Sequence, residues 1–353
     1  MRFWTSILTL IAIAPATLSA QEFHRGDPVP ATMPLGNVPG NPTVDMMPGQ
    51  RLISAFGERP ALSPDGTKVA FIGKSYGDAY EYDLTTGRTR NLTSHAPSEG
   101  FLRVQYLPDG SYLLLGPHML GKTREETRNN KIELFWMDAE ALRPPVPLNT
   151  QVWEGVAISR RNNLIAWGQL NSIDGKPVSA TIRTARVAVE KGTARLENVS
   201  EVFTTSDCLI EAQDFTPDDR ALTMPCYNAL GKLPAGTQAD VVSLDLATKK
   251  LTRYPTPRGM YNEVEGIFPD GRRTLVECAQ DRSAGMDLCI LDLNPVAPLY
   301  TRMTNIVRYG RWKYGNPVVR PDGRMIAAQV GPADVVDAGV GQGIVLMNLA
   351  ADF

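Results

Sequence analysis

Short apolar stretches separated by polar turns run along most of the chain, and each stretch has the length of a β-strand. In the first repeating unit the pattern predicts antiparallel strands at residues 60–63, 68–72, 80–84 and 90–93. The third strand of each unit is apolar at almost every position, as residues 288–293 illustrate. Strands of this kind are buried on both faces, so we expect the units to pack face to face.

One turn motif separates the first two strands of each unit. It reads Pro-Asp-Gly or a close variant, in which Pro presets φ, Asp accepts hydrogen bonds from the main chain and Gly tolerates positive φ. A degenerate copy at residues 159–162 has Arg in place of Pro. The anchor positions are spaced by 44, 52, 57, 52 and 52 residues, at Pro64, Pro108, Arg160, Pro217, Pro269 and Pro321. This period predicts an all-β, six-bladed β-propeller with four-stranded antiparallel blades.

The sixth unit reaches the end of the chain at Phe353 after only three strands. Residues 51–54 resemble the outer strand at 90–93 and directly precede the first blade. We therefore expect residues near 49–55 to complete the last blade and to close the ring. Closure removes the open sheet edges that would otherwise pair with other chains.

The first twenty residues have the pattern of a secretory signal, with Arg2 ahead of an apolar core at 7–15 and small residues before Gln21. The apolar core is too short to span a bilayer. We expect a signal peptide at 1–20, an extended Pro- and Gly-rich arm at 21–48 and the propeller at 49–353. The mature protein should be periplasmic or secreted, monomeric and not inserted in a membrane.

The Pro-Asp-Gly turn, the strand after it and the Leu-Asp-Leu end of the third strand, as at 291–293, resemble the repeats of TolB-type periplasmic propellers. The resemblance covers roughly residues 50–353 and implies the fold. TolB proteins carry an α/β domain before the propeller, which the arm at 21–48 does not provide, so a Tol–Pal partnership is not implied. The same blade type resembles the propellers of some oligopeptidases and of oligogalacturonate lyases.

Four cysteines all lie in the second half of the chain. An even number of cysteines in an exported chain favours disulfides, and four allow three pairings. We favour Cys208–Cys226 and Cys278–Cys289, because each pair is nearly symmetric about a predicted hairpin turn. A zinc site is the alternative, although the spacings are not those of paired Cys-x-x-Cys ligands.

The charge balance excludes one class of partner. The chain has 36 basic and 38 acidic residues and a net charge of −2, so it lacks the basic signature of nucleic-acid binding. Residues 73–77 match Gly-x-Ser-x-Gly, but they lie between two predicted strands and no helix follows, so they do not form a nucleophile elbow. We assign no catalytic residue, metal ligand or cofactor.

One position of the repeat concentrates carboxylates. Six residues before each anchor stand Glu58, Leu102, Glu154, Glu211, Glu263 and Gly315, and four of these are glutamates. This position begins each innermost strand and should lie near the mouth of the channel. The set predicts an acidic site for a cation, an amine or a basic peptide segment, and Ca²⁺ or another divalent ion is compatible with it. The alternative is that each Glu accepts hydrogen bonds from nearby main-chain N–H groups.

A second set of candidate ligand-binding residues lies in the loops that should surround the same mouth. The set combines histidines with the Arg, Tyr and Trp side chains that dominate many binding sites, namely His95, His118, Arg124, Arg258, Tyr261, Arg311, Trp312 and Tyr314. The alternative is that the aromatic residues fill gaps between blades and that the histidines are solvated.

These patterns predict a non-catalytic binding or scaffold module for a protein, peptide or glycan at the channel face. The alternative is a lyase or hydrolase that acts on a saccharide or small molecule, with His95, His118 and a glutamate meeting at one ligand position.

Overall fold

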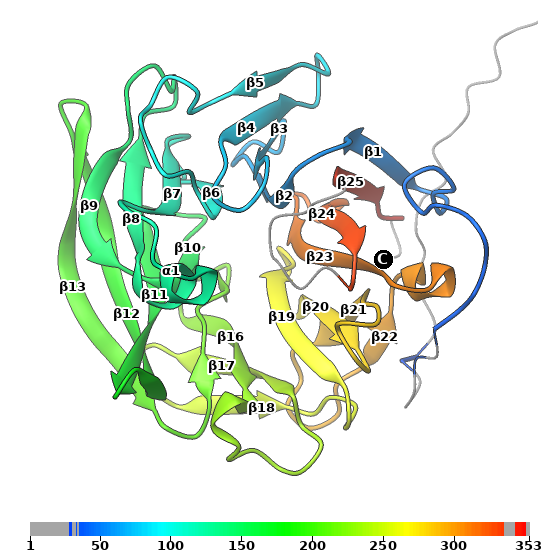
Figure 1. Cartoon of the computed structure of the whole chain (residues 1–353). Helices are drawn as coiled ribbons and strands as arrows, with labels where there is room; N and C mark the ends of the chain where they lie inside the picture. The colour runs from blue at the N-terminus through cyan, green and yellow to red at the C-terminus, as the bar shows by residue number, and fades with distance from the viewer. Residues whose placement is uncertain (1–27, 30–32, 34, 335–342, 351–353) are drawn as a thin grey trace, which may run out of the picture.

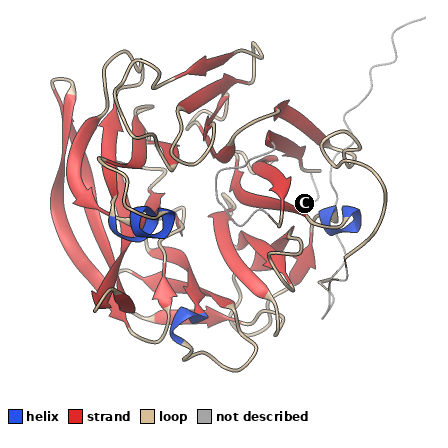
Figure 2. Cartoon of the chain, viewed as in Figure 1, coloured by secondary structure: helices blue, strands red, loops and turns tan. Residues whose placement is uncertain are grey.

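The computed structural model describes residues 28–29, 33, 35–334 and 343–350. These residues form six antiparallel sheets arranged radially about a common axis (Figure 1). Strands make up nearly all of the regular structure, with only short helices between them (Figure 2). The predicted six-bladed β-propeller is therefore confirmed.

Each blade runs outward from the axis in chain order, so its first strand is innermost. The first three blades contain β2 (Glu58–Leu62), β3 (Lys68–Ile72), β4 (Ala79–Asp83) and β5 (Thr89–Asn91); β6 (Arg103–Tyr106), β7 (Tyr112–Pro117), β8 (Ile132–Met137) and β9 (Val146–Gln151); and β10 (Trp153–Ile158), β11 (Leu164–Ile173), β12 (Lys176–Glu190) and β13 (Thr193–Thr205).

The last three blades follow the same order, except that the innermost strand of blade four is broken in two. They contain β14 (Leu209–Ile210), β15 (Asp214–Phe215), β16 (Ala221–Tyr227), β17 (Ala239–Asp245) and β18 (Leu251–Tyr254); β19 (Tyr261–Ile267), β20 (Arg273–Ala279), β21 (Asp287–Asp292) and β22 (Tyr300–Arg302); and β23 (Trp312–Val319), β24 (Met325–Pro332), β25 (Gly343–Asn348) and β1 (Gln50–Ser54).

The ring closes with a strand from near the start of the chain. β1 is the outer strand of blade six and pairs antiparallel with β25, with Arg51 opposite Leu346 and Leu52 opposite Val345. Leu52 packs against the apolar cluster between blades five and six. The expected closure by residues near 49–55 is thus observed.

The Pro-Asp-Gly turns are satisfied by their own loops. In blade one, Asp65 Oδ1 accepts from Ser63 Oγ at 2.6 Å and from the Thr67 N–H at 3.0 Å. Gly66 has a φ of 69°, which a residue without Cβ adopts at little cost. The motif therefore fixes the reversal between the two innermost strands by local bonds alone.

Both predicted disulfides are present. Cys208 and Cys226 have Cα atoms 5.4 Å apart, and Cys278 and Cys289 have Cα atoms 5.9 Å apart. The second disulfide joins the adjacent strands β20 and β21. Two disulfides fit a protein that folds in an oxidising compartment outside the cytoplasm.

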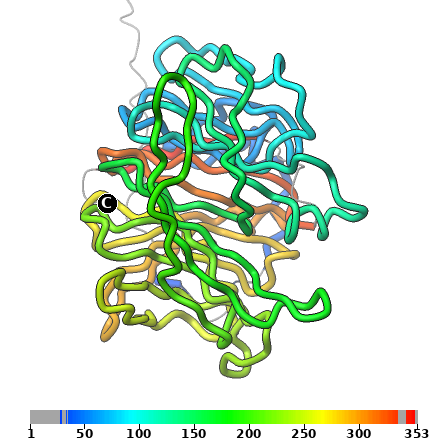
Figure 3. The backbone as a smooth tube through the Cα atoms, turned by 90° about the vertical axis from the view of Figure 1, so that its left-hand side faces the viewer, coloured from blue at the N-terminus to red at the C-terminus, as the bar shows by residue number. Residues whose placement is uncertain are grey.

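Two insertions depart from the repeat. The helix α1 (Arg124–Asn130) lies between β7 and β8 and is capped by Thr123, whose side chain accepts from the Glu126 N–H. The strands β12 and β13, of 15 and 13 residues, form a long hairpin on the outside of the ring (Figure 3). Neither the helix nor the length of the hairpin was expected from the sequence.

The described part of the arm lies against blade five and the segment leading into blade six. Met33 is buried in an apolar cluster of blades four and five, and the Gly36 N–H donates to the carbonyl of Val307 in the short helix η2 (Ile306–Tyr309) at 2.8 Å. The proposed signal at 1–20 lies outside the described residues. No helix in the described ranges is long and apolar enough to cross a membrane.

Candidate functional site

The innermost strands are irregular along their length, and we call the end of the channel at which they begin the channel mouth. Pairing registers shift in four of them, between Glu58 and Ala61 and at the corresponding places in β10, β19 and β23. In blade four the break between β14 and β15 lies at the same level. Such bulges re-aim side chains, so consecutive residues, such as Glu265 and Gly266, both border the channel.

A cavity of about 390 Å³ opens at this mouth. A second cavity, of about 240 Å³, lies at the opposite end, which we call the turn end because Pro64, Pro108 and Pro321 line it. The two cavities share some lining residues and so belong to one channel. The mouth cavity is lined by residues of every blade, including Arg59, Arg103, Arg128, Trp153, Glu154, Tyr227, Tyr261, Glu263, Glu277, Arg282, Lys313 and Asn316.

Arg128 and Glu154 form the strongest ion pair of the mouth. Arg128 extends from α1, and its Nε and Nη2 each lie 2.5 Å from a different carboxylate oxygen of Glu154. Burial alone would raise the pKa of Glu154, but the guanidinium holds it below its ordinary value. The Glu154 carboxylate is therefore ionised, and both of its oxygens already accept hydrogen bonds from Arg128.

Glu211 lies in the break of blade four and is almost completely buried. Its carboxylate accepts from Tyr227 Oη at 3.1 Å and faces Arg103 Nη2 at 3.4 Å. Burial, reinforced by the negative charge of Glu154, raises the pKa of Glu211 to about 8. The Glu211 carboxyl therefore holds a proton at neutral pH for most of the time.

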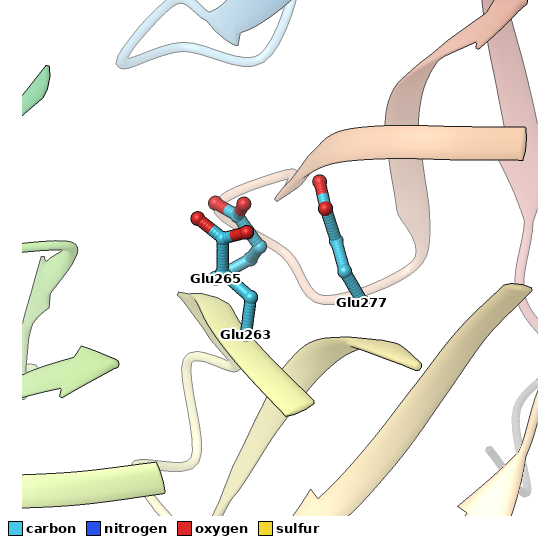
Figure 4. A group of neighbouring side chains, drawn as sticks. All are labelled: Glu263, Glu265 and Glu277. Atoms are coloured by element: carbon cyan, nitrogen blue, oxygen red, sulfur yellow. The ribbon is translucent and has the colours of Figure 1, made fainter. Parts of the chain in front are cut away.

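Three further glutamates meet on blade five (Figure 4). One oxygen from each of Glu263, Glu265 and Glu277 lies within 4.8 Å of the others. Tyr227 and Tyr261 donate hydrogen bonds to Glu263, and the Asn316 N–H donates to Glu277 at 2.5 Å.

Two of these carboxyls bind protons more readily than an ordinary glutamate. Burial and the Glu263 charge raise the pKa of Glu277 to about 7, and burial raises the pKa of Glu265 as well. The three glutamates offer the oxygen ligands that hard divalent cations prefer, and the raised pKa values of Glu265 and Glu277 favour their protonated forms when no cation is bound.

Among the residues predicted from the sequence, the structure brings Glu154, Glu211, Glu263 and Tyr261 together around the mouth cavity. Glu58 is buried and accepts from Ser75 Oγ at 2.7 Å. Glu58 does not line the mouth cavity.

The other predicted residues lie away from this cavity. His118 is half exposed, 3.1 Å from Glu133, and its ring contacts Phe135. Tyr314 is buried between blades five and six and donates to Gln50 at 2.8 Å, with Trp312 packed against the same cluster. Arg124 lies in the first turn of α1. The remaining three predicted residues are exposed and lie in loops, namely His95, Arg258 and Arg311.

Several lining residues escaped the sequence analysis. The position five residues before the anchor carries Arg59 and Arg103 in the first two blades, and this repeated cation was a readable signal. Arg128, Tyr227 and Glu277 come from outside the innermost strands and share no repeat position.

No family model and no curated protein matches the chain. A gluconolactonase from Xanthomonas campestris is similar in structure, with 11% identity, a TM-score of 0.54, and 96% of this chain and 99% of that chain covered. An oligogalacturonate lyase from Vibrio parahaemolyticus has 11% identity and a TM-score of 0.52 over 94% and 100% of the two chains. These similarities show a shared fold.

TolB, whose repeats the sequence resembles, is also among the similar structures. The TolB of Acinetobacter baumannii has 13% identity, a TM-score of 0.49, and 85% of this chain covered. The present chain spans 63% of the length of that TolB chain.

Proposed function

We propose that the protein is a non-catalytic binding module that holds an extended peptide segment of a protein partner at the channel mouth. The observation that supports this proposal is the mouth cavity of about 390 Å³, which is lined by cationic, carboxylate and aromatic side chains. A peptide presents charges of both signs and main-chain amides, which match this lining. A neutral glycan would leave the buried guanidinium of Arg59 without a counter-ion.

The aromatic wall supports the same proposal. Trp153 and Tyr227 meet edge to face with ring centroids 6.1 Å apart, and Arg282 stacks over Tyr261 at 5.1 Å. Rigid aromatic and arginine side chains are enriched where proteins bind other chains. The ring fixes these groups before the ligand arrives, which lowers the entropy cost of binding.

Catalysis is the second candidate, because two carboxyls have the perturbed pKa values common in active sites. Glu211 and Glu277 bind protons near neutral pH and border or adjoin the cavity. Either carboxyl could serve as a general acid toward a saccharide or small molecule. An enzyme that uses His95 and His118 at one ligand position gains no support. His95 is exposed, and His118 pairs with Glu133 away from the mouth.

The two candidates are separated by binding and turnover measured on the same preparations. The wild type and the variants Glu263→Gln and Glu99→Gln would be applied to a random-peptide array and a neutral-glycan array. We expect the wild type and the exposed control Glu99→Gln to bind a shared set of peptides, and Glu263→Gln to lose at least tenfold in affinity.

Two results would contradict the proposal. One is equal peptide binding by the wild type and Glu263→Gln. The other is release of product from lactones or uronate oligosaccharides by the wild type but not by Glu211→Gln, which would establish the enzyme instead.

A further inference from the structure

Arg59 is a buried cation that has no ion-pair partner among the residues that the structure describes. It follows Glu58 in the bulge of β2, its exposed fraction is 6%, and it borders both cavities of the channel. Its main-chain N–H donates to Gln329 Oε1 at 2.9 Å, which fixes the backbone. In contrast, Nε of its guanidinium has no hydrogen-bond partner, and the group forms no ion pair with any residue that the structure describes.

Other arginines in the same channel are paired. Arg128 is bidentate to Glu154, and Arg160 at the turn end lies 2.5 Å from Asp214. A guanidinium remains charged in proteins, so it cannot reduce the cost of burial by losing a proton as a lysine does. Burial without a counter-ion therefore destabilises the folded protein, and the unpaired group at Arg59 needs an explanation.

The carboxylates near Arg59 compensate its charge only in part. The Glu58 carboxylate is bonded to Ser75, and the Glu154 carboxylate is taken by Arg128. Burial, followed by the charges of Arg103 and Arg128, lowers the pKa of Arg59, and the charges of Glu58 and Glu154 oppose this shift without cancelling it.

Arg103 extends the same surface. It stands at the equivalent position of the next blade, its side chain is 11% exposed, and its Nε also lacks a partner. Its one ion pair, to Glu211, is 3.4 Å long, and that carboxyl holds a proton at neutral pH. Two adjacent blades thus present guanidinium groups to the channel with donors left unused.

We propose that Arg59, assisted by Arg103, binds a carboxylate group of the ligand inside the channel. This inference rests on the proposed function and names the anchor point of the ligand. A guanidinium matches a carboxylate through two parallel hydrogen bonds. A single negative charge fits better than a doubly charged phosphate, because the carboxylates of Glu154, Glu263 and Glu277 line the same channel and would repel a second charge.

If Arg59 binds a ligand, its replacement should change the melting temperature differently from the replacement of an arginine that holds the fold together. Replacing a buried arginine that holds the fold together lowers the melting temperature. Replacing Arg59 with Met removes an uncompensated charge, so Arg59→Met should melt at least as high as the wild type while losing the ligand. Arg128→Gln is the matched comparison. This variant leaves the Glu154 carboxylate without its cation, so its melting temperature should fall.

The test is a titration followed by melting temperature at constant ionic strength. The probes are sodium acetate, the tripeptide Gly-Gly-Gly with a free carboxylate, and the same tripeptide as its amide, with sodium chloride as the salt control. We expect at least one carboxylate probe to raise the melting temperature by about 3 °C at saturation and the amide to have no effect. Arg59→Gln and Arg59→Met should lose the rise, and the exposed control Arg258→Gln should keep it.

The arms of the titration also identify the source of the carboxylate. A full effect with acetate indicates a free small acid, and an effect with the tripeptide acid alone indicates the end of a peptide chain. The inference is overturned if no carboxylate probe raises the melting temperature, if Arg59→Gln responds like the wild type, or if Arg59→Met is strongly destabilised. If array peptides bind equally as acids and amides, this inference fails and the proposed function stands.

Discussion

The two ends of the channel use the same strands in different ways. At the turn end the polar groups are satisfied within single loops, as Asp65 is by Ser63 and Thr67. At the mouth the polar groups reach between blades, as Arg128 of blade two reaches Glu154 of blade three. The repeated motif therefore builds the scaffold, and the departures from it build the site.

The one irregular turn is an exception to this distinction. Arg160 replaces the proline of the motif, and its guanidinium contacts Asp214 of blade four and the carbonyl of Ile267 in blade five at 3.0 Å. It thereby ties three blades together and leaves no unpaired charge. At the mouth, in contrast, Arg59 Nε and Arg103 Nε are buried without hydrogen-bond partners among the residues that the structure describes. Both arginines line the mouth cavity, where we propose that a ligand binds.

Opening the ring should disrupt both ends of the channel, because the structure of both ends depends on closure. A chain that starts at residue 57 lacks β1 and exposes the edge of β25, which is apolar along most of its length. We expect its melting temperature to fall by more than about 10 °C, with aggregation through the open edge. A chain that starts at residue 28 is the control. Equal melting of the two chains would show that β1 does not close the ring.

Changing the pH should affect the two ends in opposite directions. The folded pKa values of Glu211 and Glu277, about 8 and about 7, exceed the ordinary value near 4.5, so the folded state binds more protons. Their contribution to stability is present at low pH and is lost as the pH rises from about 5 to 8. The turn aspartates Asp65 and Asp322 have lowered pKa values, so their contribution is lost only as the pH falls below about 4.

Urea unfolding between pH 5 and pH 8 checks this difference. We expect the free energy of unfolding to fall across that range, and Glu211→Gln to make the dependence shallower. Asp65→Asn is the control and should leave the slope unchanged. A wild type whose stability rises from pH 5 to pH 8 would show that the mouth carboxyls do not hold extra protons.

Removing the Arg128 side chain tests how much one ion pair between blades at the mouth contributes to stability. Arg128→Gln leaves the buried Glu154 carboxylate without its cation and should cost about 2 kcal/mol. This figure lies below that for a fully buried pair, since a third of the Arg128 side chain is exposed. The double variant Arg128→Gln, Glu154→Gln should recover most of the loss. A double variant as unstable as the single one would mean that the pair contributes through packing alone.

The smallest effect is expected at the turn end. Asp65→Ala removes the acceptor of the Ser63 hydroxyl and the Thr67 N–H and should cost about 1 kcal/mol by chemical denaturation. Because the damage stays within one loop, peptide binding at the mouth should not change. A loss of binding with this variant would show that the two ends are coupled.

The fold was readable in the sequence because its determinants are local. A turn motif recurs at nearly constant spacing, and apolar third strands such as β21 identify the buried middle of each blade. The site was readable only in part. Alternation along a regular strand would turn Arg59 away from the axis if Glu58 faced it, but the bulge in β2 cancels that alternation. Arg128 was hidden for another reason, since it lies in a helical insertion that no repeat position predicts.

The pairing of β1 with β25 also sets the order in which the molecule can be completed. The strand that finishes the sixth blade leaves the ribosome before any blade exists, and its partner emerges after nearly all of the others. Contacts between such distant segments form slowly, because the intervening chain must first become compact. Five blades can therefore stack during synthesis, while the sixth cannot be completed until β25 has been made.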